Sequence, residues 1–147
     1  MTHRATELSL GLAAEQLFES LPRETREALG NLPVVLKRLG EDATSLRARH
    51  NEISEALAAG GDASSGAAYA EVRATRDQLH ARLGEVVSSM ETIRLQLLRL
   101  HAGTATVQSV TTHLGLAADV SDEVQRLIEA HAEVDRVLRQ TPTPTPA

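Results

Sequence analysis

His50 is the first residue whose type and place suggest chemistry, because it interrupts a regular run of apolar residues. In the segment SLRARHNEISEAL, residues 45–57, leucine or isoleucine recurs at helical spacing on both sides of this histidine. An imidazole at such a place can bind a metal ion, act as a pH switch or mark register in a packed interface. The groups that the fold places beside His50 decide among these roles.

Catalytic and cofactor motifs are absent from the sequence. The chain has no cysteine, which excludes disulfides, thiolate nucleophiles and thiolate metal sites. It carries no glycine-rich phosphate loop, no His-Glu-x-x-His motif and no repeated Glu-x-x-His pattern of the kind that holds two irons in a helical bundle. We therefore expect a protein that is not an enzyme and that uses no cofactor or metal.

The composition favours helices packed on helices. Hydrophobic residues make up 41% of the 147 residues, but the chain has only one Phe, one Tyr and no Trp. A net charge of −5, spread over alternating acidic and basic residues, and the lack of stacking aromatics argue against nucleic acid as a partner. No apolar stretch approaches the roughly 20 residues that span a bilayer, and Glu15 interrupts the apolar N-terminal run. The sequence thus predicts a soluble, cytoplasmic protein.

Glycine and proline divide the chain into five helical segments. We expect helices over residues 6–21, 23–29, 33–59, 67–101 and 104–139, with a loop at residues 60–66, a stop at Gly103 and Thr104 as a cap. The first helix has an apolar stripe, which consists of Leu8, Leu10, Leu12, Leu17, Phe18 and Leu21. The ending TPTPTPA, residues 141–147, is typical of a disordered tail. The predicted parts are residues 1–31 (an N-terminal helix and a short connecting helix), 32–140 (a bundle) and 141–147 (the tail).

The three long helices share a coiled-coil-like seam. Apolar residues at alternating spacings of four and three run over residues 32–57, 69–100 and 107–138. Antiparallel pairing gives residue numbers that sum to 125 or 126 across the first hairpin and to 207 across the second. The predicted fold is therefore an all-α, antiparallel up-down bundle of three long helices with an additional N-terminal helix.

The two registers bring three polar seam residues into one candidate layer. His50 pairs with Arg76 across the first hairpin, and Arg76 pairs with His131 across the second. Three interpretations stay open for this layer: partly solvated packing, a register-specifying polar layer, and a metal or pH-sensing site. Two histidines and an arginine make a poor metal site because the guanidinium repels cations.

Apolar residues that the seam does not need gather near the second hairpin turn. They are Val34, Val35, Leu95, Leu98 and Leu116. They can bury the N-terminal helix, or they can form an exposed apolar surface for a partner or a second copy of the chain.

The second half of the chain resembles a known kind of segment. METIRLQLLRLHAG, residues 90–103, followed by TVQSVTTHLGLAADVSDEV, residues 106–124, is similar to helical segments attached to some bacterial eukaryotic-type serine/threonine protein kinases. The resemblance implies a noncatalytic segment with a regulatory or oligomerising role. The chain has none of the catalytic motifs of a kinase domain.

These observations lead to two functional expectations. The first is a noncatalytic α-helical module for protein–protein interaction, regulation or oligomerisation, whose partner is another protein or a second copy. The alternative is a small-ligand or metal-binding bundle that uses the layer of His50, Arg76 and His131.

Overall fold

The computed structural model describes the chain over residues 3–60 and 66–140, with side-chain exposure over residues 7–60 and 66–133 and at Arg136. The elements are α1 (His3–Glu19), α2 (Arg23–Ala28), α3 (Leu32–Ala59), α4 (Ala67–His101) and α5 (Val107–Gln140). Over these residues every regular element is a helix, which confirms the predicted all-α fold. The predicted tail at 141–147 and most of the predicted loop at 60–66 lie outside the described residues.

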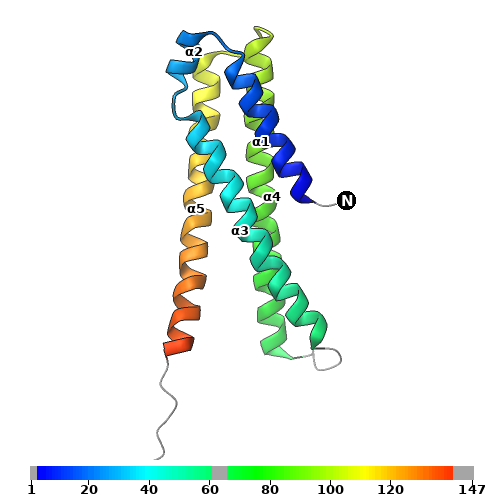
Figure 1. Cartoon of the computed structure of the whole chain (residues 1–147). Coiled ribbons are helices and arrows are strands. Elements are labelled where there is room, and N and C mark those ends of the chain that lie inside the picture. The colour runs from blue at the N-terminus through cyan, green and yellow to red at the C-terminus, as the bar shows by residue number, and fades with distance from the viewer. Residues whose placement is uncertain (1–2, 61–65, 141–147) are drawn as a thin grey trace, which may run out of the picture.

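The long helices α3, α4 and α5 lie side by side in alternating directions (Figure 1). The short helix α2 and the turn between α4 and α5 are at the same end of the molecule, which we call the α2 end. Helix α1 packs on α3 and α4 next to this end and stops partway along them. The bundle therefore has four helices at the α2 end and three at the other end.

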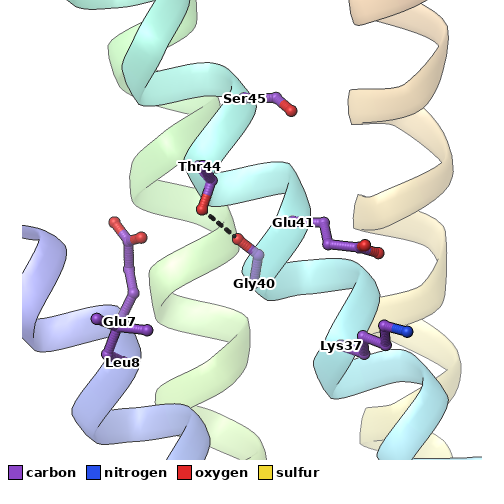
Figure 2. A pocket seen from close by; sticks show the side chains of 7 residues that line it. All are labelled: Glu7, Leu8, Lys37, Gly40, Glu41, Thr44 and Ser45. Carbon is purple, nitrogen blue, oxygen red and sulfur yellow. Dashed lines mark hydrogen bonds between the residues drawn. The ribbon is translucent and has the colours of Figure 1, made fainter.

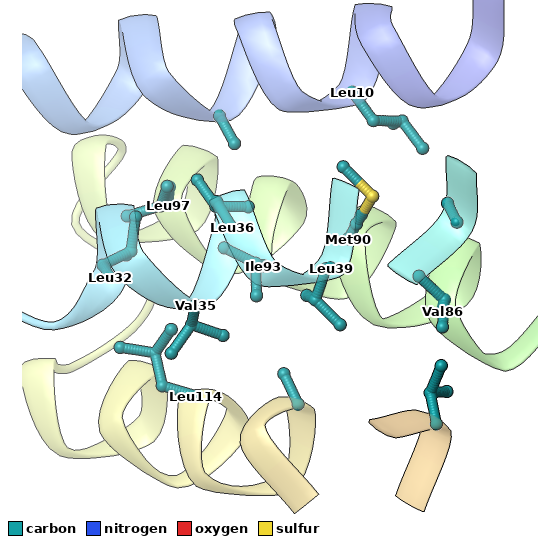
Figure 3. Close-up of a cluster of buried hydrophobic side chains, with 14 of the residues drawn as sticks. Leu10, Leu32, Val35, Leu36, Leu39, Val86, Met90, Ile93, Leu97 and Leu114 are labelled. Carbon is teal, nitrogen blue, oxygen red and sulfur yellow. The ribbon is translucent and has the colours of Figure 1, made fainter. Parts of the chain in front are cut away.

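The core consists of predicted seam positions, most of them leucine, valine and alanine (Figure 3). Its buried seam residues are Leu32, Leu36, Leu39, Ala43, Leu46, Leu79, Leu83, Val86, Met90, Ile93, Leu97, Val110, Leu114, Ala117 and Val124. Farther from the α2 end the seam is less well covered: Ile53 is only partly buried, and Val72 is 39% exposed. Leu46, Leu79 and Val124 are the last buried apolar residues of the three helices in this direction.

Helix α4 stops at Gly103, as predicted, and this glycine has a left-handed conformation. Gly103 has φ 81°, a conformation that costs a residue with a Cβ atom more than it costs glycine. Its N–H donates to the Leu100 carbonyl at 3.1 Å, and the Thr104 N–H donates to the Arg99 carbonyl at 2.8 Å. This pair of bonds is a Schellman motif, which satisfies the last carbonyls of α4. Because Thr104 belongs to this motif, Thr106 caps α5 instead, and its hydroxyl accepts the Ser109 N–H at 3.1 Å.

Helix α1 buries only part of its predicted apolar stripe. Leu10 and Ala14 are buried against the bundle, and a Cβ atom at Gly11 would lie 3.6 Å from the Met90 side chain of α4. Leu8 and Leu12, predicted to widen the buried stripe, are instead 64% and 60% exposed. The two leucines lie on the outer side of α1 because a single helix seated on two others buries one narrow face.

Candidate functional site

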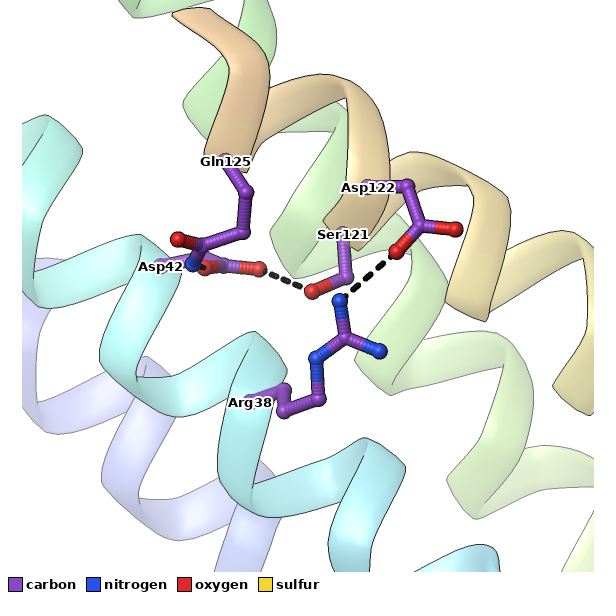
Figure 4. A network of polar contacts seen from close by, with 5 residues as sticks. All are labelled: Arg38, Asp42, Ser121, Asp122 and Gln125. Carbon is purple, nitrogen blue, oxygen red and sulfur yellow. Dashed lines mark hydrogen bonds and ion pairs between the residues drawn. The ribbon is translucent and has the colours of Figure 1, made fainter. Parts of the chain in front are cut away.

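A buried carboxylate joins α3 to α5 in the middle of the bundle (Figure 4). Asp42 is fully buried, and both of its carboxylate oxygens accept hydrogen bonds from α5. The Ser121 hydroxyl donates to Oδ2 at 2.6 Å, and the Gln125 side-chain amide donates to Oδ1 at 2.5 Å. We call Asp42, Ser121 and Gln125 the Asp42 network.

Burial dominates the electrostatics of this network. Removal from water raises the pKa of the Asp42 carboxyl above its usual value, because burial disfavours the charged form. The hydrogen bonds from Ser121 and Gln125 and the positive charge of Arg38 act in the opposite direction, but they do not cancel the rise. Arg38 itself donates to the Asp122 carboxylate at 2.7 Å, nearer the surface.

The Asp42 network fixes how α3 and α5 lie along each other. A slip of either helix would leave Asp42 against apolar side chains, at the cost of an unsatisfied buried charge. The three contacts join residues that are 79, 83 and 84 positions apart. The predicted registers imply this offset. Paired residue numbers sum to 125 between α3 and α4 and to 207 between α4 and α5, so residues of α3 and α5 whose numbers differ by about 82 lie beside each other. The offset between α3 and α5 is therefore present in the sequence, although no role was predicted for Asp42 or Gln125.

The predicted polar layer of His50, Arg76 and His131 lies farther from the α2 end, and all three side chains are partly exposed. The His50 ring has its described contact with His80 of α4, at 5.5 Å between ring centroids. Arg76 pairs with its neighbour Asp77 at 3.1 Å. His131 lines a small cavity between α3 and α5. The contacts described for His50 and Arg76 are thus with residues other than the predicted ones. The buried polar residues between α3 and α5 are Asp42 and Ser121 instead.

A second buried charge pair attaches α1 to α3. The Glu7 carboxylate, whose residue is 4% exposed, pairs with the guanidinium of Arg47. Beside it, a groove of about 560 Å³ runs between the two helices and is lined by Leu8, Lys37 and Thr44 among others (Figure 2). The groove is open to solvent on the outer face of α3, so it has no enclosed chamber for a reaction.

The predicted apolar surface is exposed at four of its five positions. Val34 is 60%, Leu95 44%, Leu98 42% and Leu116 58% exposed. The prediction is wrong for Val35, which is 5% exposed and packs in the core. It lies one position after Val34 on α3 and therefore faces α5. Helix α1 leaves the other four uncovered, so burial of the N-terminal helix does not account for them. We call Val34, Leu95, Leu98 and Leu116 the α2-end surface.

Within the described residues, no group of three or more histidine, aspartate or glutamate side chains is placed to hold a metal ion. None of the helices in the described residues carries an apolar stretch of the length that spans a bilayer. Comparisons with protein-family models, with curated proteins and with solved structures found no match for the chain.

Proposed function

We propose that this chain is a noncatalytic helical module for protein–protein interaction, with a regulatory or oligomerising role. The observation that carries the proposal is the α2-end surface, where three helices expose large apolar side chains that the bundle does not need. Large exposed apolar side chains at one end of a molecule are candidates for a site that binds other proteins. The buried polar groups of the Asp42 network act in packing, whereas the exposed side chains of the α2-end surface have no role in packing the bundle.

The resemblance to kinase-attached helices supports the same proposal. Leu95 and Leu98 lie in the first of the two segments that carry this resemblance, and Leu116 lies in the second. A bacterial source and a cytoplasmic location are further parts of the proposal. The absence of cysteine supports the second of these, since it fits a reducing compartment.

Light scattering across a range of protein concentrations tests the proposal. We expect the wild type to form dimers or larger assemblies as the concentration rises, and we expect Leu116→Glu combined with Val34→Glu to remain monomeric. The matched control is Val72→Glu, which adds a charge at a partly exposed apolar residue near the other end of α4. It should associate like the wild type.

Equal association of the control and the α2-end variant would show that this surface is not the interface. A wild type that stays monomeric at every concentration would contradict self-association, and the partner would then have to be a different protein.

A further inference from the structure

Two histidine rings lie close together across α3 and α4. The ring centroids of His50 and His80 are 5.5 Å apart, and the ring planes are tilted by 41°. His50 is partly buried and His80 is exposed, so dissolved ions can reach the pair. No hydrogen bond or ion pair of either ring occurs among the residues that the structure describes. Each neutral imidazole therefore keeps a ring nitrogen whose lone pair can bind a ligand.

The spacing of the two rings is close to that of two imidazoles on one metal ion. Zinc binds histidine nitrogens at about 2.0–2.1 Å in tetrahedral geometry, which places the centroids of two ligand rings about 5 Å apart. The separation of 5.5 Å between His50 and His80 is near this value. Because His80 is exposed, its side chain has room to turn a ring nitrogen toward an ion that it shares with His50.

The arginines one turn before each histidine are neutralised by carboxylates. Arg47, three residues before the histidine of α3, pairs with the buried Glu7 of α1. Arg76, four residues before the histidine of α4, pairs with Asp77 at 3.1 Å. An isolated guanidinium would repel a cation at this place, but each of these ion pairs offsets the positive charge close to where it arises.

We propose that His50 and His80 together bind one zinc(II) ion, with water in its remaining coordination positions. Imidazole nitrogens suit zinc, whereas magnesium and calcium prefer oxygen ligands. Water completes the coordination because no third histidine, aspartate or glutamate of the described residues is placed to join the pair. The bound ion clips α3 to α4 just beyond Leu46 and Leu79, where the buried apolar core of these helices ends.

Titration of the full chain with zinc chloride, followed by NMR of the histidine ring signals, tests the proposal. We expect the His50 and His80 signals to shift together and to saturate at one ion per chain. The signal of His101, an exposed residue at the end of α4, should not move. Magnesium chloride should shift none of these signals. Zinc shifts at only one residue of the pair, equal shifts at His101, or equal shifts with magnesium would overturn the proposal.

Single substitutions test whether both rings hold the ion. We expect His50→Gln and His80→Gln each to weaken zinc binding by more than about tenfold, since even the loss of a residue that only orients a metal ligand costs about 10–100-fold in affinity. His80 is exposed, so its substitution leaves the fold intact. The control His101→Gln should bind zinc like the wild type. Unchanged zinc affinity in His50→Gln or in His80→Gln would overturn the proposal.

Thermal unfolding measures the effect of the clip on the bundle. An ion that binds the folded chain better than the unfolded one raises the unfolding temperature. We expect saturating zinc to raise it in the wild type and in His101→Gln, and EDTA to reverse the rise. No zinc-dependent rise in the wild type, or an equal rise in His80→Gln, would contradict the clip. None of these readouts depends on self-association, so they do not test the proposed function.

Discussion

Burial between two helices disfavours the charged form of the Asp42 carboxyl. Its raised pKa means that the folded state holds this proton more tightly than the unfolded state does. Between the unfolded and folded pKa values the folded chain binds more protons, so the stabilising contribution of Asp42 is present at acidic pH and is lost as pH rises through the folded pKa. The Glu91 carboxyl has the opposite dependence, because its hydrogen bond from Arg94 lowers its pKa.

The variant Asp42→Asn isolates this effect. We expect the difference in unfolding free energy, variant minus wild type, to grow as pH rises from 4 to 7, because the amide removes the buried charge and keeps the shape. Rotation of the Gln125 amide lets it accept a hydrogen bond from the new residue. Urea melts of both proteins at several pH values measure this difference. A difference that is constant with pH would mean that Asp42 titrates like a solvated carboxyl.

Asp42→Asn removes only the charge, whereas Asp42→Ala also removes the oxygens that accept hydrogen bonds from Ser121 and Gln125. The Ser121 hydroxyl and the Gln125 amide would then lose their partner in a water-poor place, which costs about 1–3 kcal/mol. Urea melts at neutral pH measure this loss. The control Glu41→Ala, at the exposed neighbour of Asp42, should change the unfolding free energy by less than about 0.5 kcal/mol. Equal effects of the two substitutions would contradict the importance of the network.

At this scale the sequence predicts the apolar seam residues but not the Asp42 network. Leu36 and Met90 are apolar and stand at seam positions of their helices, so residue type and spacing both predict their burial. Asp42 stands directly before the seam residue Ala43, where a charged residue usually faces solvent. Its burial depends on how α3 meets α5, two helices that are not adjacent in the chain.

Helix ends follow closely from local sequence signals. The observed bounds of α4, Ala67–His101, equal the predicted ones, because a glycine stands near each end of this helix. The start of α5 differs, since the Schellman motif extends the turn and moves the cap from Thr104 to Thr106. Residue type alone cannot decide which of the two threonines, Thr104 or Thr106, caps the helix.

The turn between α4 and α5 gives a matched pair of glycine substitutions. Gly103→Ala should destabilise the fold by about 1 kcal/mol, because alanine is strained at positive φ. Gly115→Ala should stabilise it by about 0.5–1 kcal/mol, because this glycine lies within α5 and a Cβ atom there meets nothing within 4 Å. Thermal unfolding of both variants measures the two effects. If both substitutions changed the stability in the same direction, this would contradict a left-handed conformation at Gly103.

The attachment of α1 depends on Glu7. Glu7→Gln leaves Arg47 without its counter-charge and should destabilise the docked helix by about 2–3 kcal/mol. This loss is smaller than for a fully buried pair because Arg47 is partly exposed. The amides of α1 should then exchange hydrogen faster than in the wild type. Glu15→Gln, at an exposed position of the same helix, is the control.

The combination Glu7→Met with Arg47→Leu should restore much of the loss, since well-packed apolar residues often replace a buried ion pair without cost. Equal exchange of α1 in Glu7→Gln and in Glu15→Gln would show that the pair does not hold the helix.

The molecule as a whole has a closed end and a less covered end. Four helices enclose the core near α2, whereas beyond Leu46 and Leu79 three helices leave their seam partly exposed. The sequence predicts the helices and the seam that make this shape. It left open where α1 packs, because one short amphipathic helix fits any apolar groove of the right width.

We propose that the α2-end surface is the part of this molecule that contacts other proteins. Hydrogen exchange of the wild type at low and high protein concentration tests it most directly. We predict that the segments around Val34, Leu95 and Leu116 exchange more slowly at high concentration, whereas the segment around Val72 is unchanged. Slower exchange confined to the Val72 end, or identical exchange of every segment in a sample that light scattering shows to be associated, would contradict the account.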